Sequence, residues 1–268
     1  MKKCILFGAD IRHSLSPTIY GVFAAHYGIP LVYEARSVDA ASLPNEVAKV
    51  AAAGYTGCNL TNPLKQVLVN QVRWGDDLTA RLQTANVLHF LPASPPVAWN
   101  TDGSGFIADI ARYSSCAGRR VLLLGSGGIV GPLAYYLHAA GASLMIAARN
   151  KSRLQTSMQG VVDDIPLLEC AAVSGTVDMV VNATSVGLEL LQDQLPGLSW
   201  SGVAFYYDCR YGLVAEPSLQ WALSRGVLQV YSGVGMLVRQ AAHAFSIWTG
   251  YMPDHTVMEE AERRCQWR

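Results

Sequence analysis

A run of apolar residues that leads directly into a glycine loop is the feature that most restricts the fold of this chain. It reads "VLLLGSGGIVG" and covers residues 121–131. In doubly wound α/β proteins the first glycine of such a loop permits a tight turn, and the second lets backbone N–H groups approach a pyrophosphate. The loop is therefore predicted to bind a dinucleotide through Gly125, Ser126, Gly127 and Gly128. The alternative is an ordinary strand-to-helix turn, because a third glycine comes one residue late, at Gly131.

The segments around this loop repeat the same alternation of strands and helices. In the second half, "SLMIAARN", "DMVVNATS", "VAFYYDC" and "VLQVYSG" are typical of buried strands, with helical stretches between several of them. The first hundred residues also alternate, from "CILFGA" through a helix over 17–28 that Ser16 would cap, to "YTGCNL". Such alternation predicts an α/β protein with mostly parallel sheets. A second domain is expected to begin near Asp102.

The end of the second strand of the nucleotide-binding half indicates which cofactor is bound. An acidic residue there usually meets the ribose 2′-hydroxyl of NAD, whereas arginine accommodates the 2′-phosphate of NADP. The chain has no acid in "AARNKSR", which contains Arg149, Asn150 and Arg153. Guanidinium groups bind phosphate well. NADP is therefore favoured over NAD, the alternative being a solvated basic start of a helix.

Composition excludes several classes of partner. Lys plus Arg and Asp plus Glu both number 20, so there is no basic excess to bind nucleic acid. No apolar run approaches the roughly 20 residues of a membrane span, and the start "MKKCILFGAD" is interpreted as a first strand, not a signal peptide. The six cysteines form no C-x-x-C pair and the six histidines are dispersed. We therefore expect no metal, no disulfide framework and a reducing cytoplasmic location.

Small polar residues follow several strands of the first half. They occur in "HSLSP", "NLTNPLK", "TANV" and "NTDG". Because ligands of α/β sheets bind outside the carboxyl ends of the strands, these groups are expected to gather at one edge. Each also has a purely structural interpretation: Ser16 and Asp102 could be helix N-caps, and Asn86 a strand-end amide.

Taken together and in order, "IRHSLSP", "GCNLTNPLK", "NTDGSG", "GSGG", "NATSVG" and "GVGMLVRQAAHAF" resemble the shikimate dehydrogenase family over nearly the whole chain. The resemblance implies a substrate-binding and catalytic domain over 1–101, with C-terminal helices at 234–268 returning to it, and a Rossmann NADP-binding domain over 102–233. It also implies reversible NADP-linked conversion of shikimate to 3-dehydroshikimate, a step of chorismate and aromatic amino acid biosynthesis. A monomer or a homodimer is the expected assembly.

The resemblance also assigns roles to individual residues. Lys65 and Asp102 match the family's catalytic pair. The positions that match substrate-binding residues are Ser14, Ser16, Asn59, Thr61, Asn86, Tyr211 and Gln240. Beyond the glycine loop and the basic cluster, the positions expected near the cofactor are Thr184, Gly233 and Met236.

The chemistry explains why a lysine and an aspartate suit this reaction. Hydride transfer belongs to the cofactor, and the protein supplies geometry and handles the proton that leaves the alcohol. Lys65 is interpreted as the proton-transfer group and Asp102 as its partner and substrate anchor, with the holder of the proton left open. Pro63 is expected to start a short helix that aims Lys65 over the strand ends, and Asn59 and Thr61 should share one face.

Four departures from the family pattern leave the preferred substrate open. The chain reads "TANV" over 84–87 where the family usually reads G-A-V-N-T, and it carries Asp10 where proline is common. Tyr20 replaces a frequent histidine, and "GLVAEP" follows Tyr211 in place of a common N-P-x-x-T-P. Quinate or a related cyclic hydroxy acid is therefore an alternative substrate. A non-catalytic NADP-binding regulator on the same fold is an alternative of another class.

Overall fold

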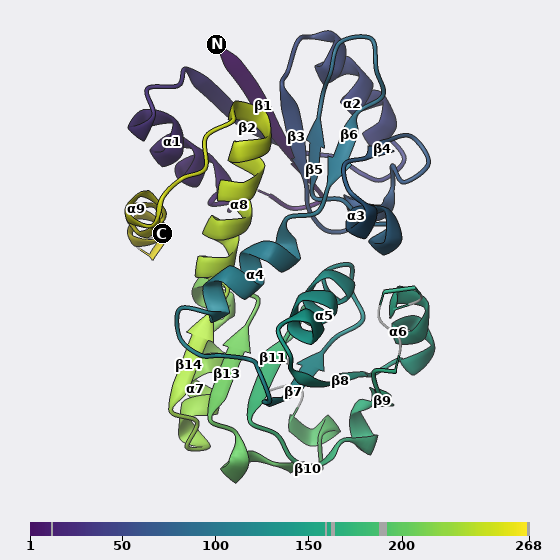
Figure 1. Cartoon of the computed structure of the whole chain (residues 1–268), viewed down its shortest axis with the longest axis vertical. Helices are drawn as coiled ribbons and strands as arrows, with labels where there is room; N and C mark the ends of the chain where they lie inside the picture. The colour runs from purple at the N-terminus through teal and green to yellow at the C-terminus, as the bar shows by residue number, and fades with distance from the viewer. Residues whose placement is uncertain (12, 159, 162–163, 188–191, 267–268) are drawn as a thin grey trace. The chain divides into compact units, whose positions relative to one another are not determined.

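A computed structural model describes residues 1–11, 13–158, 160–161, 164–187 and 192–266 of the chain (Figure 1). The chain forms two compact units: unit 1 contains residues 1–105 and 238–268, and unit 2 contains residues 106–237. The chain passes from one unit to the other inside helix α4 (Asp102–Ile110) and returns inside helix α8 (Val234–Thr249). This explains why no linker composition marks a boundary in the sequence.

Unit 1 is built on a mixed six-stranded sheet. Its strand order is β2-β1-β3-β5-β6-β4. Parallel pairs join β1 to β2 and to β3, and antiparallel pairs join β5 to β3 and to β6. The strands are β1 (Lys2–Gly8), β2 (Leu31–Ser37), β3 (Gly57–Leu60), β4 (Arg73–Trp74), β5 (Val87–His89) and β6 (Val97–Trp99).

Helices cover both faces of this sheet. Side chains alternate along β1 and β3, so Ile5, Phe7 and Cys58 join one core cluster together with Leu43 and Val47 of α2. On the opposite face, rings from α1 and α8 pack together, as the 5.5 Å between the Tyr20 and Trp248 centroids shows. The helical elements of unit 1 apart from α4 and α8 are α1 (Ser16–His26), α2 (Leu43–Ala52), η1 (Leu64–Gln66), α3 (Asp77–Leu82) and α9 (His255–Gln266).

Unit 2 is built on an entirely parallel six-stranded sheet. Its order is β14-β13-β11-β7-β8-β9. Counted from β7, this is the 3-2-1-4-5-6 order of dinucleotide-binding domains, read from the β9 edge. The strands are β7 (Arg120–Leu124), β8 (Ser143–Ala148), β9 (Leu167–Glu169), β11 (Met179–Asn182), β13 (Phe205–Asp208) and β14 (Gln229–Ser232).

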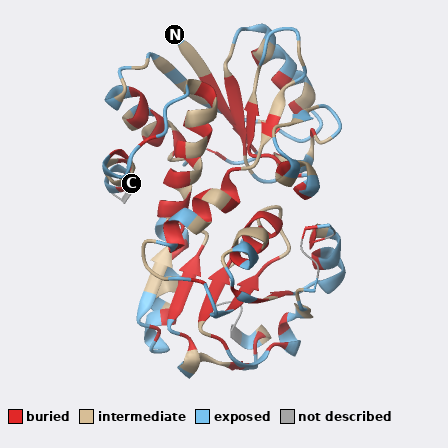
Figure 2. Ribbon diagram, in the orientation of Figure 1, coloured by how far each residue is buried: buried red, intermediate tan, exposed pale blue. Residues whose placement is uncertain are grey.

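The strands at the centre of unit 2 are fully buried, as Figure 2 shows in red. Every residue of β11 and β13 is buried, as expected for parallel strands covered on both faces. The remaining elements connect or cover the strands: α5 (Val130–Ala139), α6 (Lys151–Met158), α7 (Glu216–Ser224), β10 (Ser174–Thr176), β12 (Gly197–Ser199), η2 (Cys170–Ala172), η4 (Gln192–Gln194), η5 (Trp200–Gly202) and η6 (Gly212–Val214).

The structure confirms the predicted fold class and corrects one local detail. Ser16 is not the N-cap of α1; the helix begins at Ser16 itself, after Leu15, which makes no side-chain cap. The Ser14 hydroxyl instead accepts a hydrogen bond from the Ser16 backbone N–H at 3.2 Å. No helix within the described part of the chain has the length and apolar character needed to span a membrane.

Candidate active site

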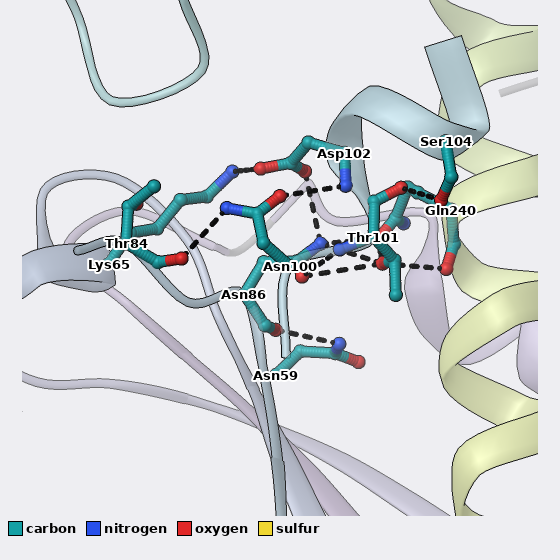
Figure 3. Close-up of polar contacts among 9 residues, drawn as sticks. All are labelled: Asn59, Lys65, Thr84, Asn86, Asn100, Thr101, Asp102, Ser104 and Gln240. Atoms are coloured by element: carbon teal, nitrogen blue, oxygen red, sulfur yellow. Dashed lines mark hydrogen bonds and ion pairs between the residues drawn. The ribbon is translucent and has the colours of Figure 1, made fainter. Parts of the chain in front are cut away.

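A buried ion pair lies at the centre of the polar cluster in unit 1 (Figure 3). Lys65 Nζ lies 2.7 Å from Asp102 Oδ2, and the two side chains are only 10% and 6% exposed. A charge in such surroundings is stable only when it is paired and hydrogen-bonded. The two residues that the family resemblance names as the catalytic pair are therefore in direct contact.

The segment that presents Lys65 is held by backbone hydrogen bonds. After β3, Thr61 N–H donates to the Phe7 carbonyl at 3.0 Å, which keeps the chain extended alongside β1. Leu64 N–H then donates to the Thr61 carbonyl at 2.8 Å and closes a turn, and the fully buried Leu64 side chain anchors it. The short helix η1 begins directly after Pro63, so Lys65 emerges from its first turn, as predicted.

Asp102 is the first residue of α4, a position that favours a carboxylate because helix N–H groups point toward it. The Asn100 Oδ1 atom accepts the Asp102 backbone N–H at 3.0 Å, so the Asn100 side chain caps this free N–H group at the start of the helix. The Asn100 amide also donates to the Thr84 carbonyl at 3.0 Å. The side chain of Asp102 is therefore left to contact Lys65 and Asn86.

Asn86 connects the ion pair to the rest of the cluster. Its Nδ2 atom lies 3.0 Å from Asp102 Oδ1, 2.9 Å from Thr101 Oγ1 and 3.1 Å from Gln240 Oε1. Its Oδ1 atom accepts the Thr101 backbone N–H at 2.8 Å. The Thr101 hydroxyl in turn donates to the Gln240 backbone carbonyl at 3.0 Å. Asn86, Asp102 and Gln240 thus lie within one hydrogen-bonded cluster.

Close packing brings Gln240 of α8 to this cluster. A side chain at Gly105 would place its Cβ only 2.5 Å from the Gln240 backbone nitrogen. Glycine is therefore required where the start of α4 meets α8. The "NTDGSG" string supplies the cap, the carboxylate and this glycine within six residues.

Asn59 has a different environment from the one that its predicted role suggests. Its Oδ1 atom accepts hydrogen bonds from the Tyr20 hydroxyl at 2.9 Å and from the Tyr33 hydroxyl at 2.6 Å. Its Nδ2 atom donates to the Asn86 backbone carbonyl at 3.0 Å. Three of the four hydrogen-bonding positions of this amide are thus occupied by the protein.

Ser14 and Thr61 lie in the loops that follow β1 and β3, and Ser16 is the first residue of α1. The Ser14 side chain is partly buried, and the Ser16 side chain is buried and hydrogen-bonds the Tyr33 hydroxyl. Thr61 packs so closely on Gly8 that a Cβ there would lie 2.4 Å from Thr61 Cγ2. Unit 1 thus carries the residues of all the predicted substrate-binding positions except Tyr211.

The glycine loop of unit 2 has the open backbone that a pyrophosphate needs. Gly125 has a φ of 137°, and a Cβ there would lie 2.9 Å from the Ala183 carbonyl oxygen. A Cβ at Gly127 would meet no heavy atom within 4 Å, so the space beside this glycine is open. Ser126 and Gly128 are partly exposed in the same loop, directly before α5. These features fit a dinucleotide phosphate at the start of this helix.

The basic cluster follows β8 at the same edge of the sheet. Arg149, Asn150 and Arg153 are all exposed. The Asn150 Oδ1 atom accepts the Arg153 backbone N–H at 2.9 Å, so Asn150 forms the N-cap of α6. Arg149 and Arg153 therefore present exposed positive charges that could bind a phosphate, whereas the oxygen of the Asn150 side chain is used to cap the helix.

Thr184 lies in a tightly hydrogen-bonded turn after β11. Its hydroxyl lies 2.8 Å from both Asn182 Oδ1 and the Val186 carbonyl. Asn182 is fully buried and donates to Asp208 Oδ2 at 3.2 Å, which Arg210 Nη2 also approaches at 2.7 Å. The "NATS" and "DCR" strings are therefore one network within unit 2.

The remaining predicted residues of unit 2 follow β13 and β14. Tyr211 precedes η6 and is partly buried. A Cβ at Gly233 would lie 2.3 Å from the Cys209 carbonyl oxygen, so glycine is required at that position. Met236 is buried at the start of α8, and its backbone N–H donates to the Tyr207 hydroxyl.

Sequence reasoning did not identify the two tyrosines that bind Asn59. Tyr33 lies in the middle of β2, where nothing in the local pattern separates it from an ordinary strand residue. Tyr20 stands out in the sequence only as a departure from the family. The strand order would have found Tyr33, because β2 and β3 both pair with β1, but Tyr20 lies on α1 and its position depends on how that helix packs on the sheet.

Comparison with known proteins identifies the family. A family model for the shikimate dehydrogenase substrate binding domain matches residues 6–88, and one for the shikimate 5′-dehydrogenase C-terminal domain matches residues 233–261. Shikimate dehydrogenase (NADP(+)) of Aeromonas salmonicida (strain A449) is 33% identical over 275 residues, which cover 98% of each chain. The chain belongs to the shikimate dehydrogenase family. This confirms the family predicted from the motifs.

Other members of the shikimate dehydrogenase family match as completely. Shikimate dehydrogenase (NADP(+)) of Dechloromonas aromatica (strain RCB) is 36% identical over 270 residues, 97% of each chain. The crystal structure of shikimate 5-dehydrogenase from Thermus thermophilus in complex with NADP(H) and shikimate has a TM-score of 0.82 and 28% identity. It covers 99% of this chain and 100% of that one. The predicted enzyme class and cofactor agree with the names of these relatives.

Proposed function

We propose that this chain is an NADP-dependent shikimate dehydrogenase that interconverts shikimate and 3-dehydroshikimate in chorismate biosynthesis. The observation that carries the proposal is the buried contact of 2.7 Å between Lys65 and Asp102, in a chain that belongs to this family. A non-catalytic regulator on the same fold would have no use for a buried ion pair of this kind, which is costly to desolvate.

In this reaction Lys65 and Asp102 handle the proton of the reacting hydroxyl. When the alcohol is oxidised, its O–H proton must leave as hydride leaves carbon. Lys65 is the proton-transfer group, and Asp102 holds both the ammonium group and the substrate hydroxyl. Asn86 donates to the other Asp102 oxygen at 3.0 Å and so fixes the plane of the carboxylate. The reverse reaction uses the same groups in the opposite sense.

Unit 1 supplies the groups that hold the acid. Ser14 and Ser16 are the proposed partners of the carboxylate, since hydroxyl donors form strong hydrogen bonds to an ionised acceptor. The proposed partners of the ring hydroxyls are Asn59, Thr61, Asn86 and Gln240. Tyr211 of unit 2 is the further proposed carboxylate contact.

Unit 2 supplies the groups that hold NADP, whose nicotinamide accepts or donates the hydride. The open backbone at Gly127 fits the pyrophosphate, and the exposed Arg149 and Arg153 fit the 2′-phosphate. Thr184 and Gly233 are proposed neighbours of the cofactor, and Met236 is the proposed neighbour of its nicotinamide. We further propose a cytoplasmic enzyme that acts as a monomer or a homodimer.

A turnover screen tests this function. Purified protein is mixed with shikimate, quinate or other cyclic hydroxy acids, each with NADP⁺ and with NAD⁺, and reduced nicotinamide is followed by its absorbance. We expect the highest kcat/KM with shikimate and NADP⁺. A higher kcat/KM with quinate would show that quinate is the preferred substrate. An absence of turnover with every acid would support a non-catalytic NADP-binding regulator.

A further inference from the structure

The Asn59 amide is surrounded by tyrosine hydroxyls in a way that no family motif predicts. The oxygens of Tyr20 and Tyr33 lie 2.9 Å and 2.6 Å from Asn59 Oδ1. An amide oxygen has two acceptor positions, and both are used here. Asn59 therefore has no remaining capacity to accept a hydrogen bond from a ligand.

A backbone carbonyl determines which end of the Asn59 amide is the oxygen and which is the nitrogen. Asn59 Nδ2 lies 3.0 Å from the Asn86 carbonyl oxygen, which also accepts the Leu60 backbone N–H at 2.9 Å. Because a carbonyl oxygen only accepts, the amide group beside it must be the NH₂ end. One hydrogen of Nδ2 is used in this contact. The second hydrogen of Nδ2 is the one hydrogen-bonding position of the side chain that these three contacts leave open.

The two tyrosine rings are packed in an aromatic cluster. Their rings stack with centroids 4.2 Å apart, and Tyr20 also packs against Trp248, whose Nε1 donates to the Leu88 carbonyl at 3.0 Å. Burial raises the pKa of both tyrosine hydroxyls well above the ordinary value. Both therefore remain protonated donors across the physiological pH range. The Tyr33 hydroxyl also contacts Ser16.

We propose that Tyr20 and Tyr33 are positioning residues that determine the hydrogen-bonding specificity of the substrate site. The two tyrosines occupy both acceptor positions of Asn59 Oδ1, so Asn59 can only donate a hydrogen bond, from Nδ2, to a ligand. The group of the cyclic acid that it binds must therefore be an oxygen that accepts. This inference rests on the proposed function.

Tyr20→Phe is the most direct test, because it keeps the ring and removes a hydroxyl whose described hydrogen bond goes to Asn59. With one acceptor position released, Asn59 Oδ1 is held by Tyr33 alone and can accept a hydrogen bond from another group. We expect the KM for shikimate to rise about 3- to 10-fold, the effect of weakening one neutral hydrogen bond. The kcat and the KM for NADP⁺ should change less than about twofold, because Lys65 and Asp102 are untouched.

Tyr27→Phe is the matched control. Its hydroxyl donates to the Met252 carbonyl at 3.0 Å, so this variant also removes a tyrosine hydrogen bond from unit 1. It should leave all kinetic constants unchanged. A purely structural role for Tyr20 would lower the Tm without changing the KM for shikimate, and that result would overturn the proposal.

A double-mutant cycle shows whether Tyr20 acts through Asn59. Asn59→Ala should raise the KM for shikimate, and adding Tyr20→Phe should raise it no further. An equal further rise would show that Tyr20 acts by another route. Tyr33→Phe should also raise the KM for shikimate, because it releases the other acceptor position of Asn59. If wild type turns over no cyclic acid, the proposed function itself fails; if it does and Tyr20→Phe has a normal KM, only this inference fails.

Discussion

Lys65 Nζ and Asp102 Oδ2 lie 2.7 Å apart, although the residues are separated by a helix, three strands and 36 intervening positions. Lys65→Met keeps a side chain of similar length and removes the amine. Since general acid–base groups typically contribute about 10²- to 10⁴-fold, we expect kcat with shikimate to fall by that range. The KM for NADP⁺ should stay near that of wild type. Lys49→Met, at an exposed lysine of α2, is the control and should be fully active.

Lys65→Met also leaves the Asp102 carboxylate buried without its ion pair. Breaking a buried pair in this way costs about 3–5 kcal/mol in the free energy of unfolding, so the Tm should fall. The double variant Lys65→Met/Asp102→Asn removes both charges and should recover much of the lost Tm without recovering kcat. If kcat returned together with stability, Lys65 would have a structural role alone.

The carboxylate-binding role of the two serines predicts a selective change in KM. In Ser14→Ala/Ser16→Ala, both hydroxyls that are proposed to meet the substrate carboxylate are absent. A hydrogen bond to a charged group contributes about 1.5–3 kcal/mol, so the KM for shikimate should rise by at least about tenfold, with the KM for NADP⁺ unchanged. Ser42→Ala, at the exposed start of α2, is the control. A normal KM in the double variant would contradict the role.

The cofactor preference depends on the exposed arginines after β8. Arg149→Ala should raise the KM for NADP⁺ by about 10- to 100-fold and leave the KM for NAD⁺ nearly unchanged, since a charge-assisted contact to phosphate is lost with one cofactor only. Arg119→Ala changes an exposed arginine just before β7, at the opposite end of that strand from the glycine loop, and should affect neither cofactor. Equal losses with NADP⁺ and NAD⁺ in Arg149→Ala would show that this residue does not bind the 2′-phosphate.

Local patterns in the sequence predict the elements that carry most of the site. Each of these features lies within one short stretch of sequence: the unbroken apolar run of β7, the glycines after it, and the polar residues after β3. The family motifs then name Lys65 and Asp102 as partners, and the structure places them in contact. The roles of the residues proposed to bind substrate and cofactor stay predictions.

Contacts between distant segments are what the sequence does not reveal. Asn59 receives its hydrogen bonds from residues 39 and 26 positions away. Tyr33 comes near through the β2-β1-β3 strand order, and Tyr20 through the packing of α1 on the sheet. Helix α3 was also not predicted, although Asp76 caps it by accepting the Thr79 backbone N–H at 2.6 Å. That Asp-Asp-Leu-Thr start is a readable cap signal, but the helix is too short to show an apolar period.

The last prediction concerns acid stability and unit 2. Asp178 accepts the Arg120 backbone N–H at 2.8 Å and contacts the Arg120 guanidinium at 2.7 Å. Hydrogen bonds from Arg120 lower the pKa of Asp178 to about 2, below the roughly 3.9 of an unfolded chain. A group whose pKa is lowered by folding stabilises the protein above its unfolded pKa, and this contribution is lost as the pH falls through about 2.

Asp178→Asn tests this, because it keeps the shape of the side chain and removes the charge. The difference in Tm between wild type and Asp178→Asn should be constant from about pH 7 to pH 5, shrink below about pH 4 and nearly vanish near pH 2. The difference should be modest because the Arg120 side chain is 48% exposed and water screens the pair. Other carboxylates titrate in both proteins, so their effects cancel in the comparison. A Tm difference that stays the same from pH 7 to pH 2 would show that the Asp178 charge does not stabilise unit 2.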